Sequence, residues 1–440
     1  MTQPNGPETA VGVTRVEALY YRSLRYVSQP LDGFQVLVGP NASGKSNFLD
    51  VLAFLGDVLS TDLDTALLGD DRLDIPLRAT DGRDLVWSGR RPRVRSLQPS
   101  FELAVEMAIP ESLLASASSS IRKVCRYEVK IDVSNQPIFV SETLCLTPRR
   151  RSSTARRQLF PHPQTPPRQI ALAPGEHAPK GWRRVVSRGR EPERVNYRAE
   201  RSGWTAPFRI APWESALANL PADDERFPAA LWFRERMRGA QRIVLSGEAM
   251  RHPCPPIRLT DYLPDGSNLP HVIHRLAESH PDRHERWVKH VREALPDIIG
   301  ITTREREEDR HRYLVLEHSN GQETPSWLVS DGTLRLLALT LLAYLPDLAG
   351  IYLIEEPENG LHPLAVETVL QSLSSVYDAQ VLLTTHSPLV ARLAKPDELL
   401  CLARDETAGT DMVKGTEHPR LRDWQGSADL GTLLASGVLG

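Results

Sequence analysis

One stretch, GPNASGKS from Gly39 to Ser46, strongly limits what this chain can fold into. It satisfies the pattern G-x-x-x-x-G-K-[ST] in full, with an apolar strand pattern, FQVLVG, leading into it and a helical pattern, NFLDVLAFLGDVL, after it. A strand, a glycine-containing loop and a helix in this order form a loop whose successive backbone N–H groups can wrap a phosphate. The sequence therefore predicts a nucleotide-binding fold of the α/β class.

The side chains of this loop predict two cofactors, ATP and Mg²⁺. Lys45 supplies a positive charge for the β- and γ-phosphates, and the hydroxyl of Ser46 is a ligand for the metal. The other small residues allow backbone N–H groups to approach the phosphates. The residues predicted to bind the nucleotide here are Gly39, Asn41, Ala42, Ser43, Gly44, Lys45, Ser46 and Asn47.

A second motif, IYLIEEPEN, places two carboxylates at the tip of a buried strand. In ATPases with such a loop, the first acid holds Mg²⁺ through water and the second polarises the attacking water. The sequence therefore predicts Glu355 as a metal ligand and Glu356 as the catalytic base. Aspartate is the usual first acid, so Glu355 keeps the charge but lengthens the reach.

A third motif, VLLTTHSP, is another apolar strand, and it ends at His386, about 30 residues after the acidic pair. A single histidine is often a structural residue. Its position after a buried strand, in this order of motifs, favours a catalytic role in sensing the γ-phosphate.

The stretch LVSDGTLRLL places a polar turn directly before an apolar helix. Two interpretations are open: Ser330 is an ordinary helix cap, or the turn offers a hydroxyl and bare backbone amides to an anion. The apolar run from Leu334 to Leu345 is interrupted by Arg335 and is shorter than the roughly 20 residues of a membrane helix. It predicts a buried helix.

Taken together, GPNASGKSN, VSDGT, IEEPENGLHP and TTHSP resemble the ABC-type ATPase heads of the SMC and RecF class. The NGLHP and THSP segments make the chain more similar to the predicted ATPases related to the overcoming-lysogenisation-defect (OLD) nucleases, and YYRSL resembles their N-terminal strand. The resemblance covers about the first hundred residues and most of the last hundred and thirty. It implies an α/β ABC-type head with a mixed central sheet, formed by both ends of the chain around a basic, loop-rich and helical insertion.

This resemblance gives the polar turn a function. In the family it is the signature, usually a serine followed by two glycines, so Ser330 and Gly332 would cap the γ-phosphate held by another subunit. Asp331 replaces a glycine and puts a carboxylate near phosphate. A complete site then needs two chains, which predicts a homodimer or a higher even oligomer. Asn359 and His362 resemble the D-loop that crosses such an interface.

Composition divides the chain into four segments: 11–147 and 301–440 as the two parts of the head, 148–210 as an Arg/Pro-rich insertion, and 211–300 as a mainly helical one. Residues 148–204 show little apolar periodicity, which predicts loop. Two interpretations remain open: a phosphate-backbone patch for DNA, or an ordinary solvated insertion. Three aromatic residues are candidates for stacking on bases: Trp182, Tyr197 and Trp204.

The remaining composition excludes several classes of protein. The net charge of −3 over 440 residues gives no global attraction to nucleic acid, and no stretch has the length or composition of a membrane helix or a signal peptide. Four cysteines without metal-type spacing suit a reducing cytoplasm. No glutamine can be assigned to the family's Q-loop except Gln98, by position only.

OLD nucleases carry a Toprim nuclease domain after the ATPase, but only about 50 residues follow His386 here, fewer than the roughly 100 of a small domain. Three acids in an expected hairpin, Asp405, Glu406 and Asp411, are interpreted as solvated rather than metal-binding. The predicted function is an ATPase whose ATP-dependent dimerisation controls a separately encoded effector, by analogy a Toprim-like nuclease, in anti-phage defence.

Two alternatives come from other classes. One is a RecF-like repair ATPase that binds DNA through the Arg-rich insertion and has no toxic partner. The other is the nucleotide-binding subunit of a transporter, which the ENGLHP segment and the large insertion disfavour.

Overall fold

The computed structural model describes residues 12–70, 72–73, 75–87, 89, 99–114, 122–149, 157–256, 261–346, 348–405, 407–422, 430–437 and 439. The chain forms two compact units, which are described separately. The first takes its described residues from 1–240, 396–427 and 437–440, and the second from 241–395 and 428–436. Gln98 and Glu406 lie outside the described residues, as do residue 11 and residues 150–156 of the Arg/Pro-rich segment.

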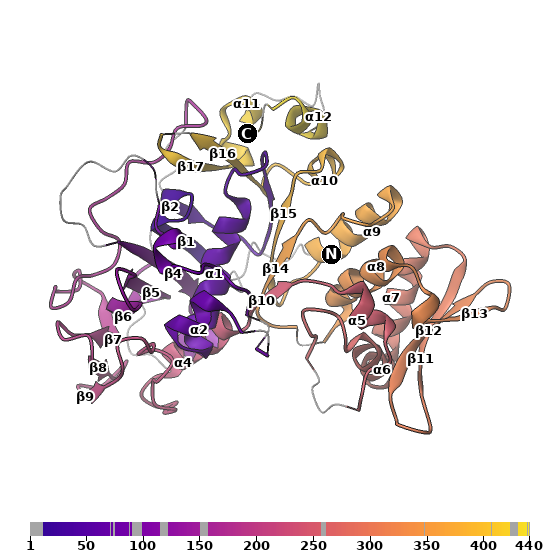
Figure 1. The fold of residues 1–440 in the computed structure, drawn as a ribbon, viewed down its shortest axis with the longest axis horizontal. Helices are drawn as coiled ribbons and strands as arrows, with labels where there is room; N and C mark the ends of the chain where they lie inside the picture. Colours follow the sequence, from indigo (N-terminus) through magenta and orange to yellow (C-terminus); the bar gives the residue numbers. More distant parts are fainter. Residues whose placement is uncertain are drawn as a thin grey trace, which may run out of the picture. The chain divides into compact units, whose positions relative to one another are not determined.

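The first unit is built on an eight-stranded antiparallel sheet, in which the strands lie in the order β2-β1-β4-β5-β6-β7-β8-β9 (Figure 1). The strands are β1 (Val13–Tyr21), β2 (Leu24–Pro30), β4 (Ser100–Ala108), β5 (Val124–Asp132), β6 (Ile138–Thr147), β7 (Arg183–Arg188), β8 (Arg194–Arg198) and β9 (Thr205–Arg209). Its helices are α1 (Lys45–Ser60), α2 (Leu63–Leu68), η1 (Gly82–Leu85), α3 (Glu111–Leu114), α4 (Pro228–Arg238), η4 (Gly415–Glu417) and α11 (Pro419–Arg422).

One face of this sheet is apolar and is covered by α1 and α4. Phe54 of α1 packs edge-on against Phe101 of β4, with ring centroids 5.9 Å apart, and Phe233 of α4 contacts Tyr127 of β5 at the same centroid distance. All four side chains are fully buried. Because successive strand residues point to opposite faces, the alternate residues of β4 and β5 must face the other side.

The opposite face carries buried charges. Arg126 of β5 forms ion pairs with Glu17 at 2.5 Å, Glu106 at 2.9 Å and Glu128 at 2.9 Å, and all four residues are nearly inaccessible to solvent. Burial raises the pKa of Glu128 even though Arg126 opposes that shift. Such a cluster is tolerated only where it is covered and its remaining hydrogen bonds are satisfied.

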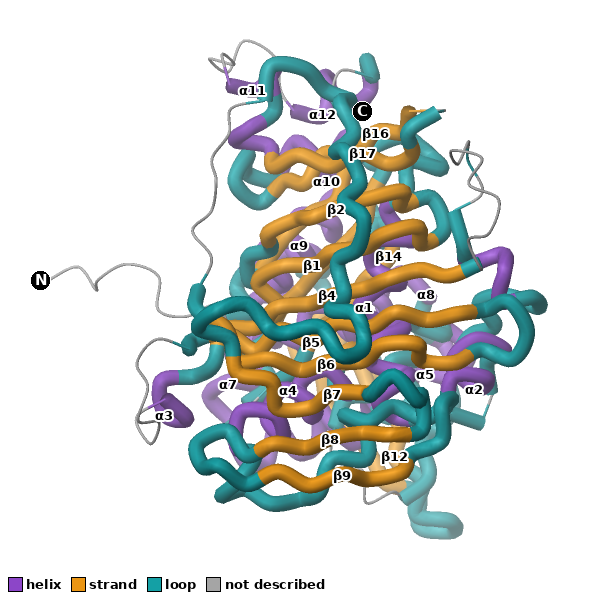
Figure 2. Tube along the Cα trace, turned by 90° about the vertical axis from the view of Figure 1, so that its left-hand side faces the viewer, coloured by secondary structure: helices purple, strands orange, loops and turns teal. Residues whose placement is uncertain are grey.

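The cover is residues 157–182, which we call the strap. Figure 2 shows this loop running across the strands of the sheet. Near its start, Arg157 forms an ion pair with Asp411 at 2.7 Å. Further along, the backbone N–H of Ile170 donates to the Glu102 carboxylate at 2.6 Å. Polar loop backbone thus satisfies the buried carboxylates of the sheet.

A separate group of strands in the first unit supports the phosphate loop. β3 (Phe34–Val38) runs parallel to β16 (Leu399–Asp405), and β16 forms an antiparallel hairpin with β17 (Gly409–Lys414). Residues near both ends of the chain therefore form one structure, as the resemblance implied.

The second unit combines parallel strands, an antiparallel three-stranded sheet and helices. β14 (Ile351–Glu355) and β15 (Gln380–Thr385) are parallel, and β10 (Ala240–Ile243), which starts at the unit boundary, lies beside β14. The antiparallel strands are β11 (Ile298–Glu305), β12 (Arg312–His318) and β13 (Glu323–Pro325). The helices are α5 (Gly247–Arg251), α6 (Leu269–Ser279), α7 (Pro281–Ala294), η2 (Ser326–Leu328), α8 (Asp331–Leu341), η3 (Leu342–Tyr344), α9 (Pro363–Ser374), α10 (Pro388–Leu393) and α12 (Leu430–Ala435).

The apolar run expected to be a buried helix is α8 followed by η3, and most of its side chains are buried. Trp287 of α7 donates to the hydroxyl of Thr340 in α8 at 3.0 Å, and both side chains are fully buried. In the part of the chain that the structure describes, no helix is long and apolar enough to cross a membrane.

Three sequence-based expectations are wrong in part. The stretch 148–204 is not loop throughout, because β7 and β8 lie within it and β9 follows directly, and Val195 and Tyr197 bury one face of β8. Tyr197 is not available for stacking on bases, since it is fully buried and its hydroxyl donates to Ala216 O at 2.7 Å. Asp411 is not solvated, because it is 2% exposed and paired with Arg157 of the strap.

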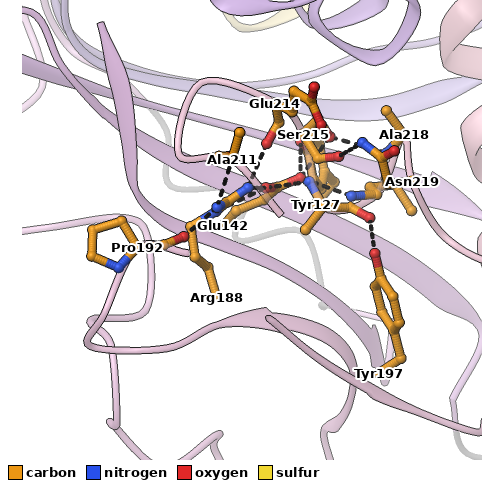
Figure 3. Close-up of polar contacts among 12 residues, drawn as sticks. Tyr127, Glu142, Arg188, Pro192, Tyr197, Ala211, Glu214, Ser215, Ala218 and Asn219 are labelled. Carbon is orange, nitrogen blue, oxygen red and sulfur yellow. Dashed lines mark hydrogen bonds and ion pairs between the residues drawn. The ribbon is translucent and has the colours of Figure 1, made fainter. Parts of the chain in front are cut away.

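The interior of the first unit also contains a cluster around Glu142 of β6 (Figure 3). Its carboxylate accepts hydrogen bonds from the Tyr127 hydroxyl at 2.9 Å and the Ser215 hydroxyl at 2.7 Å, and it pairs with Arg188 at 3.1 Å. The side chains of Glu142 and Arg188 are completely inaccessible. Burial, followed by the charge of Glu142, raises the pKa of Tyr127 well above its usual value.

Candidate nucleotide site

The phosphate loop connects β3 to α1, and two of its glycines have no room for a side chain. Gly39 has a φ of 156°, and a Cβ there would collide with the carbonyl oxygen of Leu402 on β16. Gly44 has a φ of 103°, and a Cβ there would collide with the Thr410 side chain on β17. Both positions thus require glycine for packing as well as for any approach of phosphate.

Lys45 is the first residue of α1, and its side chain is folded across the loop. Its ammonium donates to the carbonyl oxygens of Gly39 at 2.7 Å and Pro40 at 2.9 Å, and the residue is only 8% exposed. Ala42 adopts a left-handed φ of 62° without being glycine. This conformation is rare for residues with a side chain and is concentrated at functional sites.

A hydrogen-bonded brace that the sequence did not predict holds the loop from below. Thr410 of β17 donates to Ser43 O at 2.9 Å and lies 3.0 Å from the hydroxyl of Ser23 in the β1–β2 turn. Ser23 in turn accepts a hydrogen bond from Asn47 at 2.9 Å. Asn47 was predicted to bind nucleotide, and in the structure its amide links α1 to this brace. Ser23, in YYRSL, and Thr410, in the β16–β17 hairpin, are far apart in sequence and adjacent only in the folded chain. The sequence alone could therefore not identify them as supports of the loop.

In the second unit, the acidic pair lies where β14 ends. Glu355 is exposed at the tip of the strand, paired in register with Thr384 of β15. Glu356 follows it with a left-handed φ of 48°, and its backbone N–H donates to Thr384 O at 2.9 Å. The neighbouring strand thus fixes a strained backbone at the second acid.

Both carboxylate oxygens of Glu356 contact residues that the sequence had singled out. His386 Nδ1 lies 2.9 Å from one oxygen, and Asn359 donates to the other at 2.6 Å. The side chain of Glu356 is still 34% exposed and that of His386 is 48% exposed. The structure therefore brings Glu356, Asn359 and His386 together and leaves the carboxylate accessible to water.

Glu358, two residues further on, is a member of this group that the sequence did not predict. Its carboxylate accepts a hydrogen bond from the Thr385 hydroxyl at 2.5 Å, and its second oxygen is buried without a hydrogen-bonding partner. Burial raises the pKa of Glu358, and the nearby Glu356 adds to that effect. A carboxyl group with a raised pKa beside a candidate base can hold a proton.

The residues fit a magnesium ion held mainly by phosphate and water. In the described part of the chain there is no group of three or more His, Cys, Asp or Glu side chains that could hold a metal. Mg²⁺ in nucleotide sites commonly takes only one or two protein ligands and keeps several waters. Each unit supplies one predicted ligand of this kind, Ser46 at the start of α1 in the first unit and Glu355 at the tip of β14 in the second.

The turn before α8 is a real helix cap. Ser330 is its N-cap, and its hydroxyl accepts a hydrogen bond from Thr333 N at 3.2 Å. Ser330 and Asp331 are exposed. A Cβ at Gly332 would lie 2.5 Å from the carbonyl oxygen of Gly360, so Gly332 allows the signature turn to pack against the loop after the acidic pair. His362 in that loop caps α9 by accepting from Leu364 N at 3.3 Å.

Comparisons with known proteins agree with this set of motifs. A family model described as "AAA domain, putative AbiEii toxin, Type IV TA system" matches residues 34–112 and 157–392, more than half of the chain. No curated protein matches.

Among solved structures, the crystal structure of an SmcHead bound to the C-winged helix domain of ScpA is similar, with a TM-score of 0.52 and 14% identity, over 91% of this chain and 97% of that one. The SMC head domain from Thermotoga maritima has a TM-score of 0.42 and 12% identity, over 92% of this chain and 98% of that one. The first of these similarities confirms the predicted fold class, an α/β head of the SMC ATPase type with mixed sheets.

Proposed function

The chain belongs to the AAA-domain family whose model it matches, and from this premise we propose that it binds and hydrolyses ATP. It acts as a dimer, and each of the two ATP sites is completed by residues of both chains. ATP-dependent association then controls a separately encoded effector. The observation that carries the proposal is the carboxylate of Glu356, fixed by His386 and Asn359 yet accessible to water.

The proposed chemistry assigns each side chain a role. Glu356 accepts a proton from the attacking water while His386 holds the carboxylate in place and donates towards the γ-phosphate. Lys45 turns from the loop carbonyls to the phosphates, which offer it a full negative charge in exchange. Ser46 and Glu355 would be the protein ligands of Mg²⁺, which would supply positive charge to the phosphates.

Replacing Glu356 by Gln tests the base directly. The amide keeps the hydrogen-bonding shape but cannot accept the proton, so we expect hydrolysis to slow by about 100-fold or more while ATP remains bound. Glu367→Gln, on the exposed side of α9, is the control with the same loss of charge. If Glu355→Gln were the purely catalytic lesion instead, the roles of the two acids would be reversed.

The shared site is tested at Ser330. A cap alone is worth about 1 kcal/mol of stability, so under that interpretation Ser330→Arg keeps its hydrolysis. Under the proposal, each chain still binds ATP through Lys45 but hydrolysis collapses, because arginine blocks the approach of a second copy. Mixing Ser330→Arg with Lys45→Ala regenerates one intact site per heterodimer, so activity partly recovers on mixing. Full hydrolysis by Ser330→Arg alone would refute the shared site.

The effector, by analogy a Toprim-like nuclease related to the OLD systems, and the role in anti-phage defence rest on the family resemblance alone. The test is co-purification of the chain with the product of the neighbouring gene, with ATP and without it. ATP-dependent capture of a nuclease or toxin supports the proposal. A neighbour that is never captured, in either state, contradicts it.

A second candidate function is DNA binding by a RecF-like ATPase. Three arginines are exposed on adjacent strands, Arg194 and Arg198 on β8 and Arg209 on β9. Burial, followed by repulsion from Arg198 and Arg122, lowers the pKa of Arg183 on the next strand, which indicates a local excess of positive charge. Arg194 and Arg209 also pair with glutamates, which reduces that excess.

The DNA-binding alternative is tested by salt dependence. Wild-type affinity for duplex DNA should fall steeply with salt, and replacing the three exposed arginines by Ala should reduce the slope by about 0.9 for each phosphate that the protein no longer neutralises. Because residues 183–209 form strands, deleting the segment would damage the sheet, so point substitutions are required. No DNA binding by the wild type at low salt would eliminate this candidate.

A further inference from the structure

An arginine that is far from the signature turn in sequence, but in the same unit, binds both sides of the turn. Arg251, the last residue of α5, donates from Nε to the carbonyl oxygen of Val329 at 3.1 Å. Its Nη2 lies 2.7 Å from the carboxylate of Asp331. These two contacts fall on either side of Ser330, so one guanidinium holds both ends of the exposed serine.

The first residue of α5 also packs closely against the carboxylate of Asp331. A Cβ on Gly247, the first residue of α5, would collide with the side chain of Asp331. In addition, the hydroxyl of Ser326, which is fully buried, donates to the backbone carbonyl of Arg251 at 2.9 Å. The backbone and side chain of Arg251 are therefore both fixed to the segment that contains the turn.

The negative charge of Asp331 needs a cationic partner if the signature turn is to bind phosphate. An aspartate at a helix N-terminus is favourable for the helix, but it repels an incoming anion. Arg251 neutralises that charge at contact distance, and its side chain remains 33% exposed, so the guanidinium is accessible at the same surface as Ser330. A planar guanidinium can pair with a carboxylate and still orient donors towards a phosphate.

We propose that Arg251 is a positioning residue of the signature turn, and that its pairing with Asp331 is what allows an aspartate-containing turn to accept the γ-phosphate held by a second copy of this chain. This inference rests on the proposed function. The inference predicts that hydrolysis requires Arg251 only while Asp331 is charged. When the charge of Asp331 is removed, Arg251 should no longer be required.

The experiment is a double-mutant cycle in the full chain, with steady-state hydrolysis of ATP and binding of ATP to single chains as readouts. Arg251→Ala should lower kcat by about 10- to 100-fold, because a small misplacement of a site can cost about 100-fold in rate, with unchanged ATP binding through Lys45. Asp331→Asn should stay within about threefold of wild type, and Arg251→Ala with Asp331→Asn should recover to that level. Arg251→Lys keeps the positive charge but loses the planar guanidinium, so its kcat should lie between those of Arg251→Ala and the wild type.

The control is Arg304→Ala, which breaks an exposed ion pair with Glu323 in the same unit and should leave kcat unchanged. Wild-type kcat in Arg251→Ala would overturn the inference, and so would a double variant as slow as Arg251→Ala alone. Ser330→Arg is measured alongside. If it hydrolyses ATP at the wild-type rate, the proposed function itself fails. If it is inactive while Arg251→Ala is fully active, only the role of Arg251 fails.

Discussion

Glu142 in the first unit and Glu356 in the second are both glutamates on or next to a strand, but their surroundings differ. Glu142 is completely inaccessible and accepts hydrogen bonds from Tyr127, Ser215 and Arg188 (Figure 3). Glu356 is one-third exposed and contacts His386 and Asn359.

The difference indicates what each unit does with charge. A carboxylate whose oxygens are satisfied inside the protein cannot turn to a ligand, and breaking such a pair leaves an uncompensated buried charge. The carboxylate of Glu356 keeps access to water, and removing an exposed ion pair costs little stability. The Glu142 pair of the first unit is therefore structural, whereas Glu356 of the second unit has the exposure that the proposed hydrolysis requires.

The largest effect that tests this comparison is expected at Arg188. Replacing it by Ala leaves Glu142 buried without its cation, which should lower the free energy of unfolding by about 3–5 kcal/mol. The measurement is chemical unfolding, with Arg194→Ala on the exposed face of β8 as the control. Arg194→Ala should change stability by no more than about 0.5 kcal/mol. Similar stabilities for the two variants would show that the buried pair has no structural role.

His386→Ala should give the next largest effect, and on activity alone. Without the imidazole beside Glu356, hydrolysis should slow by about 100-fold, equivalent to about 2.7 kcal/mol in the barrier. Thermal unfolding should remain at the wild-type value, because the pair is exposed. His274→Ala, which breaks another exposed histidine–glutamate pair, is the matched control. A large loss of stability in His386→Ala would remove the distinction between the units.

A second histidine, His418 in the first unit, sharpens the comparison through pH. Burial, and then the charge of Arg420, lowers the pKa of His418 to about 4. Its ring packs against Phe160, and its Nε2 is buried without a partner. The unfolded chain binds this proton from about pH 6.5 downwards and the folded chain does not, so stability should fall as the pH is lowered from 6.5 towards 4.

Allowing for partial screening by solvent, this loss should be on the order of 1–2 kcal/mol. His418→Gln removes the titrating group, so the difference between its unfolding free energy and that of the wild type should shrink as the pH is lowered over this interval. A difference that stays constant across the interval would contradict the prediction.

The smallest expected effect is at Tyr197, whose buried hydroxyl donates to Ala216 O. Tyr197→Phe keeps the ring and removes one hydrogen bond, so it should lower stability by about 1 kcal/mol, and DNA affinity, if any, should not change. A specific loss of DNA binding in this variant would restore the stacking interpretation that burial argues against.

The sequence predicted those parts of the molecule in which the residues needed for one chemical role stand close together in the sequence. The phosphate loop, β14 with its two acids and β15 with His386 lie where the motifs placed them. The partners that came from elsewhere in the chain were not predicted. Thr410 braces the loop and Arg251 grips the signature turn, and both depend on interactions between residues far apart in sequence.

The strap is loop, as its composition predicted, but the composition did not predict that it covers the sheet. Its composition is typical of a solvated loop, since it has few apolar residues and no period. It is nevertheless ordered against the sheet, because the backbone of Ile170 and the side chain of Arg157 satisfy buried carboxylates. A loop that is needed for its hydrogen bonds leaves no signal in hydrophobic periodicity.

The β16–β17 hairpin has a consequence for the order in which the protein is made. The first unit is interrupted by residues 241–395, which belong to the second. At about 5–20 residues per second, a ribosome takes roughly 8 to 30 s to synthesise that interval. During this time β3 has no β16 to pair with, Ser43 has no Thr410, and the strap has no Asp411. A nascent chain therefore completes the hydrogen bonds around its phosphate loop only near the end of translation, and a product truncated before Thr410 lacks them.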